Sequence, residues 1–173
     1  MISITTRKAV RSICSPDFVR RRATRCLTLV GFAEAQLSIL LTSDIEIREL
    51  NRSYRQIDKP TDVLSFPQFV GTPVREIPRS GLLGDVIISL DTALRQARGG
   101  PLPRIAAALN WGRPLDGWSV RDEVSFLLLH GVLHLLGFDH LNDKDALVME
   151  GLEAQLCPML LSRKRIGKPI DFD

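Results

Sequence analysis

"SVRDEVSFLLLHGVLHLLGFDH", residues 119–140, is where the secondary structure of this 173-residue chain can be predicted most clearly. Ser119, with Asp122 three residues later, resembles a capping box and predicts the start of a helix. The helix is expected to run to about Leu136, where Gly137 provides a left-handed stop. Its apolar part is shorter than the roughly 18 residues that a membrane-spanning helix needs. We therefore expect a helix of a globular domain with a turn after it.

Apolar patterns on either side of this helix predict the remaining elements. Strands are expected at ISITT (2–6), AQLSILLTS (35–43), TDVLSF (61–66), which looks central, and GDVIISL (84–90). Helices are expected after the capping residues Ser15, Ser43, Asp91, Ser119 and Asn142 or Asp143. In the second helix, Ser43 and Glu46 form a capping box. Ile47, Leu50 and Tyr54 are expected on the inner side of that helix.

The order of these elements is β-α-β-α-β-β-α-α-α. Most strands precede most helices, which favours an α+β fold over a doubly wound sheet. The length fits one domain, residues 1–173. Prolines and glycines in residues 101–118 predict a long insertion-like loop there, although RIAAALNWG could form a helical turn. Residues 163–173 are expected to form a basic tail.

Composition is typical of a soluble globular protein, with 45% hydrophobic and 25% charged residues. The three cysteines are odd in number and form no CxxC pair, so they predict neither a disulfide framework nor a zinc-thiolate site. The N-terminus lacks a basic-then-apolar signal pattern. We therefore expect a cytoplasmic protein.

Basic residues are concentrated near the two ends of the chain. Residues 1–30 hold seven Lys or Arg against one acid, and RKRIGK closes the chain at 163–168. Such clusters attract polyanions such as RNA, although a solvated helix face with a frayed tail would have the same composition. The candidate RNA-binding residues are Arg20, Arg21, Arg22, Arg25, Arg163, Lys164 and Arg165.

All three histidines of the chain lie within residues 130–140. His130 and His134 are four apart on the predicted helix, so their rings project from one face. His140 follows the glycine stop, where the chain can curl back over the helix end. Three neutral imidazoles suit Zn²⁺ and leave a fourth position for water, whose pKa zinc can lower to about 7. The cluster predicts one zinc ion per chain; Asp139 is expected to orient a histidine or to cap the turn.

Two further residues are candidates beside the histidines. Zinc proteases of the HExxH type carry a glutamate general base after the first histidine, where this chain has Gly131. Glu123 lies two helical turns before His130, where it could bond a histidine or a water, or remain an exposed acid of the first turn. An arginine such as Arg55 could clamp a phosphate if it faces the metal, although its position alone also fits a solvated turn.

The motif HGVLHLLGFDH (130–140) resembles that of the YbeY family, the metal-dependent endoribonucleases of ribosomal RNA maturation. LNRSYRQIDKPTDVLSFP (50–67) and LGDVIISL (83–90) are similar to the family's two other motifs, in the same order, and the resemblance covers about residues 35–155. Residues 99–120 form a longer segment than the family usually has there. VRRRATR (19–25) belongs to no family motif.

The resemblance implies a zincin-like α+β fold, in which a small four-stranded mixed sheet packs with five to six helices and the three-histidine site lies at a helix end. It implies zinc on His130, His134 and His140, and a role for Arg55 in RNA cleavage. It further implies single-strand-specific cleavage in the 3′-end maturation of small-subunit ribosomal RNA and in ribosome quality control. The GTPase Era and small-subunit ribosomal proteins are the implied partners. Two alternatives are a peptidase-like zinc hydrolase and a ribosome-assembly binding factor with structural zinc.

Overall fold

The computed structural model describes residues 1–109, 117–170 and 172. Its sheet contains β1 (Ile2–Thr6), β2 (Ala35–Thr42), β3 (Val63–Pro67) and β4 (Gly81–Ser89) in the order β1-β2-β4-β3. β1, β2 and β4 are parallel, whereas β3 runs antiparallel to β4. The sheet is therefore mixed, and the prediction of an α+β fold with a four-stranded mixed sheet is confirmed.

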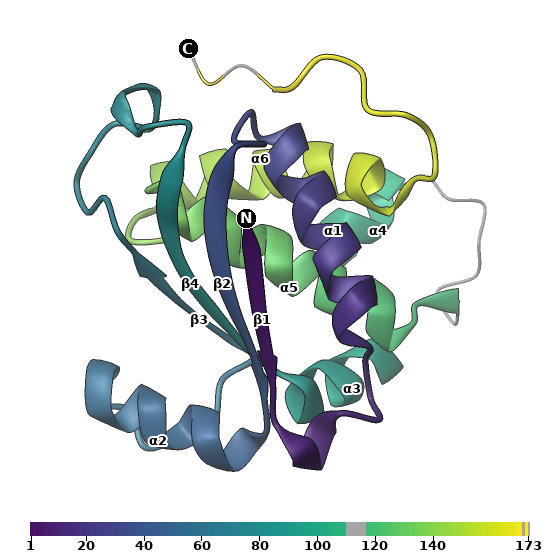
Figure 1. Ribbon diagram of the computed structural model, residues 1–173. Helices are drawn as coiled ribbons and strands as arrows, with labels where there is room; N and C mark the ends of the chain where they lie inside the picture. Colours follow the sequence, from purple (N-terminus) through teal and green to yellow (C-terminus); the bar gives the residue numbers. More distant parts are fainter. Residues whose placement is uncertain (110–116, 171, 173) are drawn as a thin grey trace.

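Most helices cover one face of this sheet (Figure 1). The helices of the described residues are α1 (Pro16–Leu29), α2 (Asp44–Arg55), α3 (Leu90–Arg98), α4 (Pro103–Leu109), α5 (Val120–Leu135) and α6 (Asp143–Leu161). Of two 3₁₀ turns, η1 (Lys8–Val10) lies between β1 and α1, and η2 (Val74–Glu76) lies between β3 and β4. α2 packs against the opposite face, where Ile47 joins Leu64 and Ile87 in a small separate cluster.

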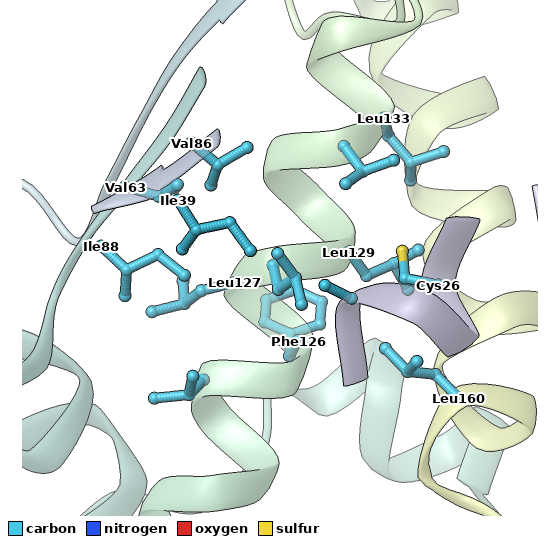
Figure 2. Close-up of a cluster of buried hydrophobic side chains, with 14 of the residues drawn as sticks. Cys26, Ile39, Val63, Val86, Ile88, Phe126, Leu127, Leu129, Leu133 and Leu160 are labelled. Carbon is cyan, nitrogen blue, oxygen red and sulfur yellow. The ribbon is translucent and has the colours of Figure 1, made fainter. Parts of the chain in front are cut away.

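The main core lies between the sheet and α5, with α1 and α6 packed behind that helix. Figure 2 shows Ile39, Val86 and Ile88 of the sheet facing the side chains of α5. Almost every residue of α5 from Glu123 to Leu135 is buried, so the helix is apolar on all sides, as expected for a helix enclosed by other elements. No helix among the described residues is long and apolar enough to span a membrane.

The ends of α5 are those expected from local sequence. Ser119 accepts from the Asp122 N–H, and the Asp122 carboxylate accepts from the Ser119 N–H, which completes the capping box. Gly137 follows the helix with a φ of +90°, a conformation that favours glycine. Both predictions are confirmed, and together they determine where the chain turns after His134.

Four local predictions were wrong. Ser43 makes no side-chain cap; Glu46 instead pairs with Arg7 and accepts a hydrogen bond from Thr42. α3 is capped by the Ser89 side chain rather than by Asp91. Tyr54 is 67% exposed and packs edge-on against Phe66.

The fourth wrong prediction concerns β3, which is an edge strand and not a central one. Pro67 lies at the end of β3. Its lack of an N–H costs no hydrogen bond there, because no second strand of the described residues pairs with this edge.

The segment predicted as an insertion-like loop, 101–118, is partly helical. α4 occupies Pro103–Leu109, packs against α6 and buries Ile105. Residues 110–116 lie outside the described residues. The basic tail has no helix or strand in its described part, but the Ile170 N–H donates to the Leu29 carbonyl and the Phe172 ring lies 5.4 Å from that of Phe138.

Candidate metal centre

The rings of the three histidines gather at the C-terminal end of α5. His130 and His134 project from the last turns of the helix, and His140 returns from the turn after Gly137. The ring centroids are 4.6 Å apart for His130–His134, 5.3 Å for His130–His140 and 5.6 Å for His134–His140. Each residue offers a nitrogen within 4.8 Å of the others. The predicted gathering is confirmed, and the group could hold a metal ion.

Hydrogen bonds orient two of these rings. His130 Nδ1 lies 2.6 Å from Oε1 of Glu153, a fully buried carboxylate of α6. His134 Nδ1 lies 2.9 Å from the carbonyl oxygen of Phe138. A carbonyl oxygen and a carboxylate are acceptors, so each Nδ1 is assigned as the donor, and in the neutral ring that a metal requires the Nε2 then offers a lone pair. The two Nε2 atoms are 3.0 Å apart. At this distance the two nitrogens either share a proton or, with both lone pairs facing each other, can bind one cation together.

The environment of His134 favours its neutral form. Its pKa is lowered from 6.5 to about 4, chiefly by burial and also by the neighbouring His130 and His140, whereas Asp139 and the Phe138 carbonyl act in the opposite direction. A metal ligand must be deprotonated, so a ring that stays neutral competes well for a cation.

The histidines line a cavity of about 960 Å³ between β3, the 69–71 loop, the turn after α5 and the first turns of α6. Its wall comprises Arg55, Thr61, Asp62, Val63, Ser65, Pro67, Phe69, Val70, Gly71, His130, His134, Gly137, Phe138, Asp139, His140, Leu141, Asp145 and Val148. The three histidines therefore lie in a cavity and not on a flat surface.

Arg55 shares this cavity with the histidines although 75 residues separate it from His130. It is the last residue of α2, and Gln56 ends the helix in the left-handed conformation with a φ of 60°. Its side chain is exposed. Within the described part of the chain no carboxylate pairs with Arg55, so its guanidinium can accept an anion.

The two other candidates occupy different places. Asp139 accepts from the His140 N–H at 2.8 Å within the turn, but its carboxylate lies 3.8 Å from His134 Nδ1, too far for a hydrogen bond, and the Phe138 carbonyl is the partner of that nitrogen. Glu123 is only 6% exposed and accepts from Trp118 Nε1 at 2.6 Å. Glu123 is therefore not an exposed acid, and it does not line the cavity that holds the histidines, so both expectations for it were wrong.

Arg22, Arg25 and residues 163–165 lie at the opposite end of α6, whereas the Arg20 guanidinium donates to the Ile2 carbonyl of β1. The Arg22 guanidinium donates to the Leu160 carbonyl, and that of Arg25 donates to the carbonyls of Met159 and Lys164. Asp145, which lines the cavity, is 15 residues from Leu160 along the helix, or about 20 Å. Arg20, Arg21, Arg163, Lys164 and Arg165 are exposed.

Sequence reasoning missed Glu153, although a signal for it exists. Met149, Leu156 and Leu160 are buried on one face of α6, and Glu153 falls on the same face by helical spacing. An acid in an apolar stripe needs a buried partner, and a histidine is one of the few that can serve. Ser65 was also missed; its Oγ is buried among the described residues without a hydrogen-bond partner.

Comparisons with known proteins agree with this geometry. A family model described as Endoribonuclease YbeY matches residues 5–102 and 112–160. A protein named Endoribonuclease YbeY from Syntrophotalea carbinolica is 44% identical over 90% of this chain and 93% of its own length. Another of that name, from Anaeromyxobacter dehalogenans, is 46% identical over 80% of this chain but only 61% of its own length.

A solved structure resembles the chain in fold. The solution structure of TM1509 from Thermotoga maritima aligns with a TM-score of 0.52 and 20% sequence identity, covering 91% of this chain and 89% of that one. At this identity the likeness concerns the fold alone.

Proposed function

The chain belongs to the YbeY family of endoribonucleases, and from this premise we propose that it is a zinc-dependent endoribonuclease that cleaves single-stranded RNA. We further propose that it acts in the cytoplasm, in the 3′-end maturation of small-subunit ribosomal RNA and in ribosome quality control. The convergence of the three histidines, in one cavity with Arg55, is the observation that carries this proposal.

The donor set fits a zinc ion. His130, His134 and His140 would hold it as neutral imidazoles, and the Nδ1 bonds to Glu153 and Phe138 leave the Nε2 atoms of the first two free to bind. When bound, zinc supplies Lewis-acid chemistry and activates water at neutral pH. Glu153 keeps the His130 ring in one orientation and one tautomer.

Arg55 is proposed to bind the phosphate at the cleaved bond. A guanidinium can donate two parallel hydrogen bonds to phosphate oxygens and can stabilise charge that develops on them. Arg55 and the three histidines line the same cavity, so one phosphate can lie beside both the guanidinium and the histidine cluster. The carbonyl of Phe138 holds the His134 ring, which therefore does not need to reorient when the substrate enters.

Gly131 argues against the peptidase-like alternative. A Cβ at this position would lie 2.8 Å from Val86 Cγ1 and 3.2 Å from Ser65 Oγ. The position therefore faces the sheet, where the glutamate base of an HExxH protease would not fit without a shift of β4. Among the described residues, the acids that line the cavity are Asp62, Asp139 and Asp145.

The basic residues are proposed to extend RNA binding beyond the cavity. If four to six of them neutralise phosphates, the logarithm of the affinity should fall with the logarithm of salt concentration with a slope of about −3 to −4. Because Phe172 packs on Phe138 near the site, substitutions Arg163→Gln, Lys164→Gln and Arg165→Gln test the tail better than truncation does. They should reduce the slope by about 2 without changing metal content. The GTPase Era and small-subunit ribosomal proteins are proposed as partners.

The deciding experiment joins metal analysis to RNA cleavage. The purified protein should contain about one zinc per chain and cleave an unstructured RNA, and His134→Ala should lose both. Glu34→Gln, at an exposed carboxyl of the turn before β2, serves as a control that should keep both. A His134→Ala protein that keeps its zinc would refute the three-histidine site, and intact protein that retains zinc but leaves RNA uncut would refute the activity.

A further inference from the structure

One wall of the histidine cavity is the open edge of β3. In the sheet order, β3 has β4 on one side and no strand among the described residues on the other (Figure 1). Val63, Ser65 and Pro67, which are alternate residues of this strand, line the cavity. Backbone groups that point away from β4 therefore face whatever enters.

The register identifies these groups. The Ser89 N–H donates to the Asp62 carbonyl at 2.8 Å, and the Gln68 N–H donates to the Leu83 carbonyl at 3.0 Å. Hydrogen-bonded and non-bonded pairs alternate along an antiparallel ladder. Even-numbered residues from 62 to 68 therefore bond to β4, and the backbone groups of Val63, Ser65 and Pro67 point outward.

Only Ser65 offers both a donor and an acceptor on this edge. Pro67 has no N–H. The Val63 N–H donates to Asp62 Oδ1 at 2.8 Å and is already satisfied. The Ser65 side chain points the other way, since its Oγ is buried near Gly131. The outward backbone N–H and C=O of Ser65 are thus the recognition groups that this strand presents.

This pair complements the Watson–Crick edge of a nucleobase. Each RNA base carries a hydrogen-bond acceptor beside a donor on that edge, and in a duplex both are already used by the partner base. A backbone N–H and C=O on one residue can bond to such an edge only when the base is unpaired. Apolar side chains close by suit the flat faces of a base, because Val70 and Leu141 line the same cavity and are 80% and 83% exposed.

We propose that the backbone N–H and C=O of Ser65 form a subsite that binds the Watson–Crick edge of one unpaired base of the substrate RNA. This subsite rests on the proposed endoribonuclease function. It places one base on the β3 edge while Arg55 binds a phosphate on the same cavity wall. It selects single strands without selecting one base.

Amide spectra of the purified, metal-containing protein test the subsite directly. Uridine 5′-monophosphate has no internucleotide bond to cleave, so it is a suitable probe. It should shift the Ser65 amide proton downfield, and its 5-methyl analogue should do the same. The N3-methyl analogue, which carries a methyl group in place of the N3–H, should not. Equal shifts with all three nucleotides, or an unmoved Ser65 amide, would overturn the proposal.

Cleavage measures the same subsite in a longer substrate. In an unstructured oligouridine, one N3-methyluridine is placed at each position in turn, with 5-methyluridine at the same positions as the control. One position, fixed relative to the cut, should reduce cleavage by about tenfold or more, as expected for loss of a bidentate base contact. A flat profile with an oligouridine that is still cleaved would overturn the subsite and leave the endoribonuclease function standing. No cleavage of the parent oligouridine would overturn both.

Backbone variation connects the profile to Ser65. Ser65→Pro removes the N–H that would donate to a uracil carbonyl oxygen, keeps the C=O that would accept from N3–H, and breaks no ladder bond, so it should reduce the preference for 5-methyluridine over N3-methyluridine at the sensitive position. Ser65→Ala keeps the backbone and should keep the preference. A folded Ser65→Pro protein with an unchanged preference would contradict the assignment. If Ser65→Pro does not fold, the amide spectra of the parent protein decide.

Discussion

Glu123→Gln should stabilise the protein at alkaline pH but not at acid pH. The pKa of Glu123 is raised from 4.5 to about 7, chiefly by burial and also by the charge of Asp62, while the hydrogen bond from Trp118 acts in the opposite direction. Only 6% of this residue is exposed, so water screens its charge little. Since each pKa unit corresponds to about 1.4 kcal/mol, the ionised carboxylate makes the folded state less stable by about 3 kcal/mol.

The direction of the effect follows from proton linkage. The pKa of Glu123 is higher in the folded chain than in the unfolded chain, so the folded state holds the proton more tightly. Its contribution to stability is fully present below about pH 4.5 and is lost as pH rises through about 7. Glutamine can accept the same Trp118 hydrogen bond without acquiring a charge, and therefore does not lose stability in this range.

The assay is urea unfolding of both proteins with EDTA present, at pH 5 and pH 8.5, followed by circular dichroism. The free energy of unfolding of the variant relative to the parent should increase by about 2–3 kcal/mol between the two pH values. The buried amide hydrogens of the introduced glutamine add an offset that does not depend on pH, so only the change is diagnostic. Glu34→Gln, at an exposed carboxyl, is the control. An equal stability difference at both pH values would refute this account of Glu123.

Three other substitutions test the site and its packing. Arg55→Ala should keep its fold and its zinc but lose most RNA cleavage, and Arg55→Lys should recover part of it. The control is Arg52→Ala, three residues earlier and outside the histidine cavity, which should cleave normally. Full activity of Arg55→Ala would exclude the proposed phosphate contact. Glu153→Gln should weaken zinc binding about 10- to 100-fold in a competition with a chelator, and unchanged affinity would mean that the His130 ring needs no orienting partner. Gly131→Ala should gain about 1 kcal/mol from helix propensity, but its methyl group should crowd the sheet at a cost of about 1–3 kcal/mol. Thermal unfolding should therefore show a net loss of stability. A more stable variant would contradict the close packing.

Local signals account for the parts of the molecule that could be predicted. The capping box at Ser119 and the glycine at 137 act within one turn of the helix, and the histidine spacing depends on helical geometry alone. These features needed no knowledge of the rest of the chain. They suffice to predict that the three histidines gather at the end of this helix.

Predictions failed where a distant residue competes with a local one. Glu46 has the spacing of a capping box, but Arg7, 39 residues away, binds its carboxylate. Glu153 reaches His130 across 23 residues and becomes a partner only when α6 packs on α5. The edge position of β3 depends on strand order, which periodicity does not report. Tertiary contacts determine these features, and the spacing of residues in one sequence does not show which distant residues will be in contact.

The open edge of β3 presents few free backbone donors, and this limits self-association. An open strand usually offers a row of donors and acceptors to which another molecule's strand can add, and such edges promote aggregation. Here the proline at 67 and the occupied N–H of Val63 leave Ser65 as the one outward donor of the strand. A second copy of the chain could form too few bonds to extend the sheet. The protein can therefore keep this edge uncovered without joining its neighbours into fibres.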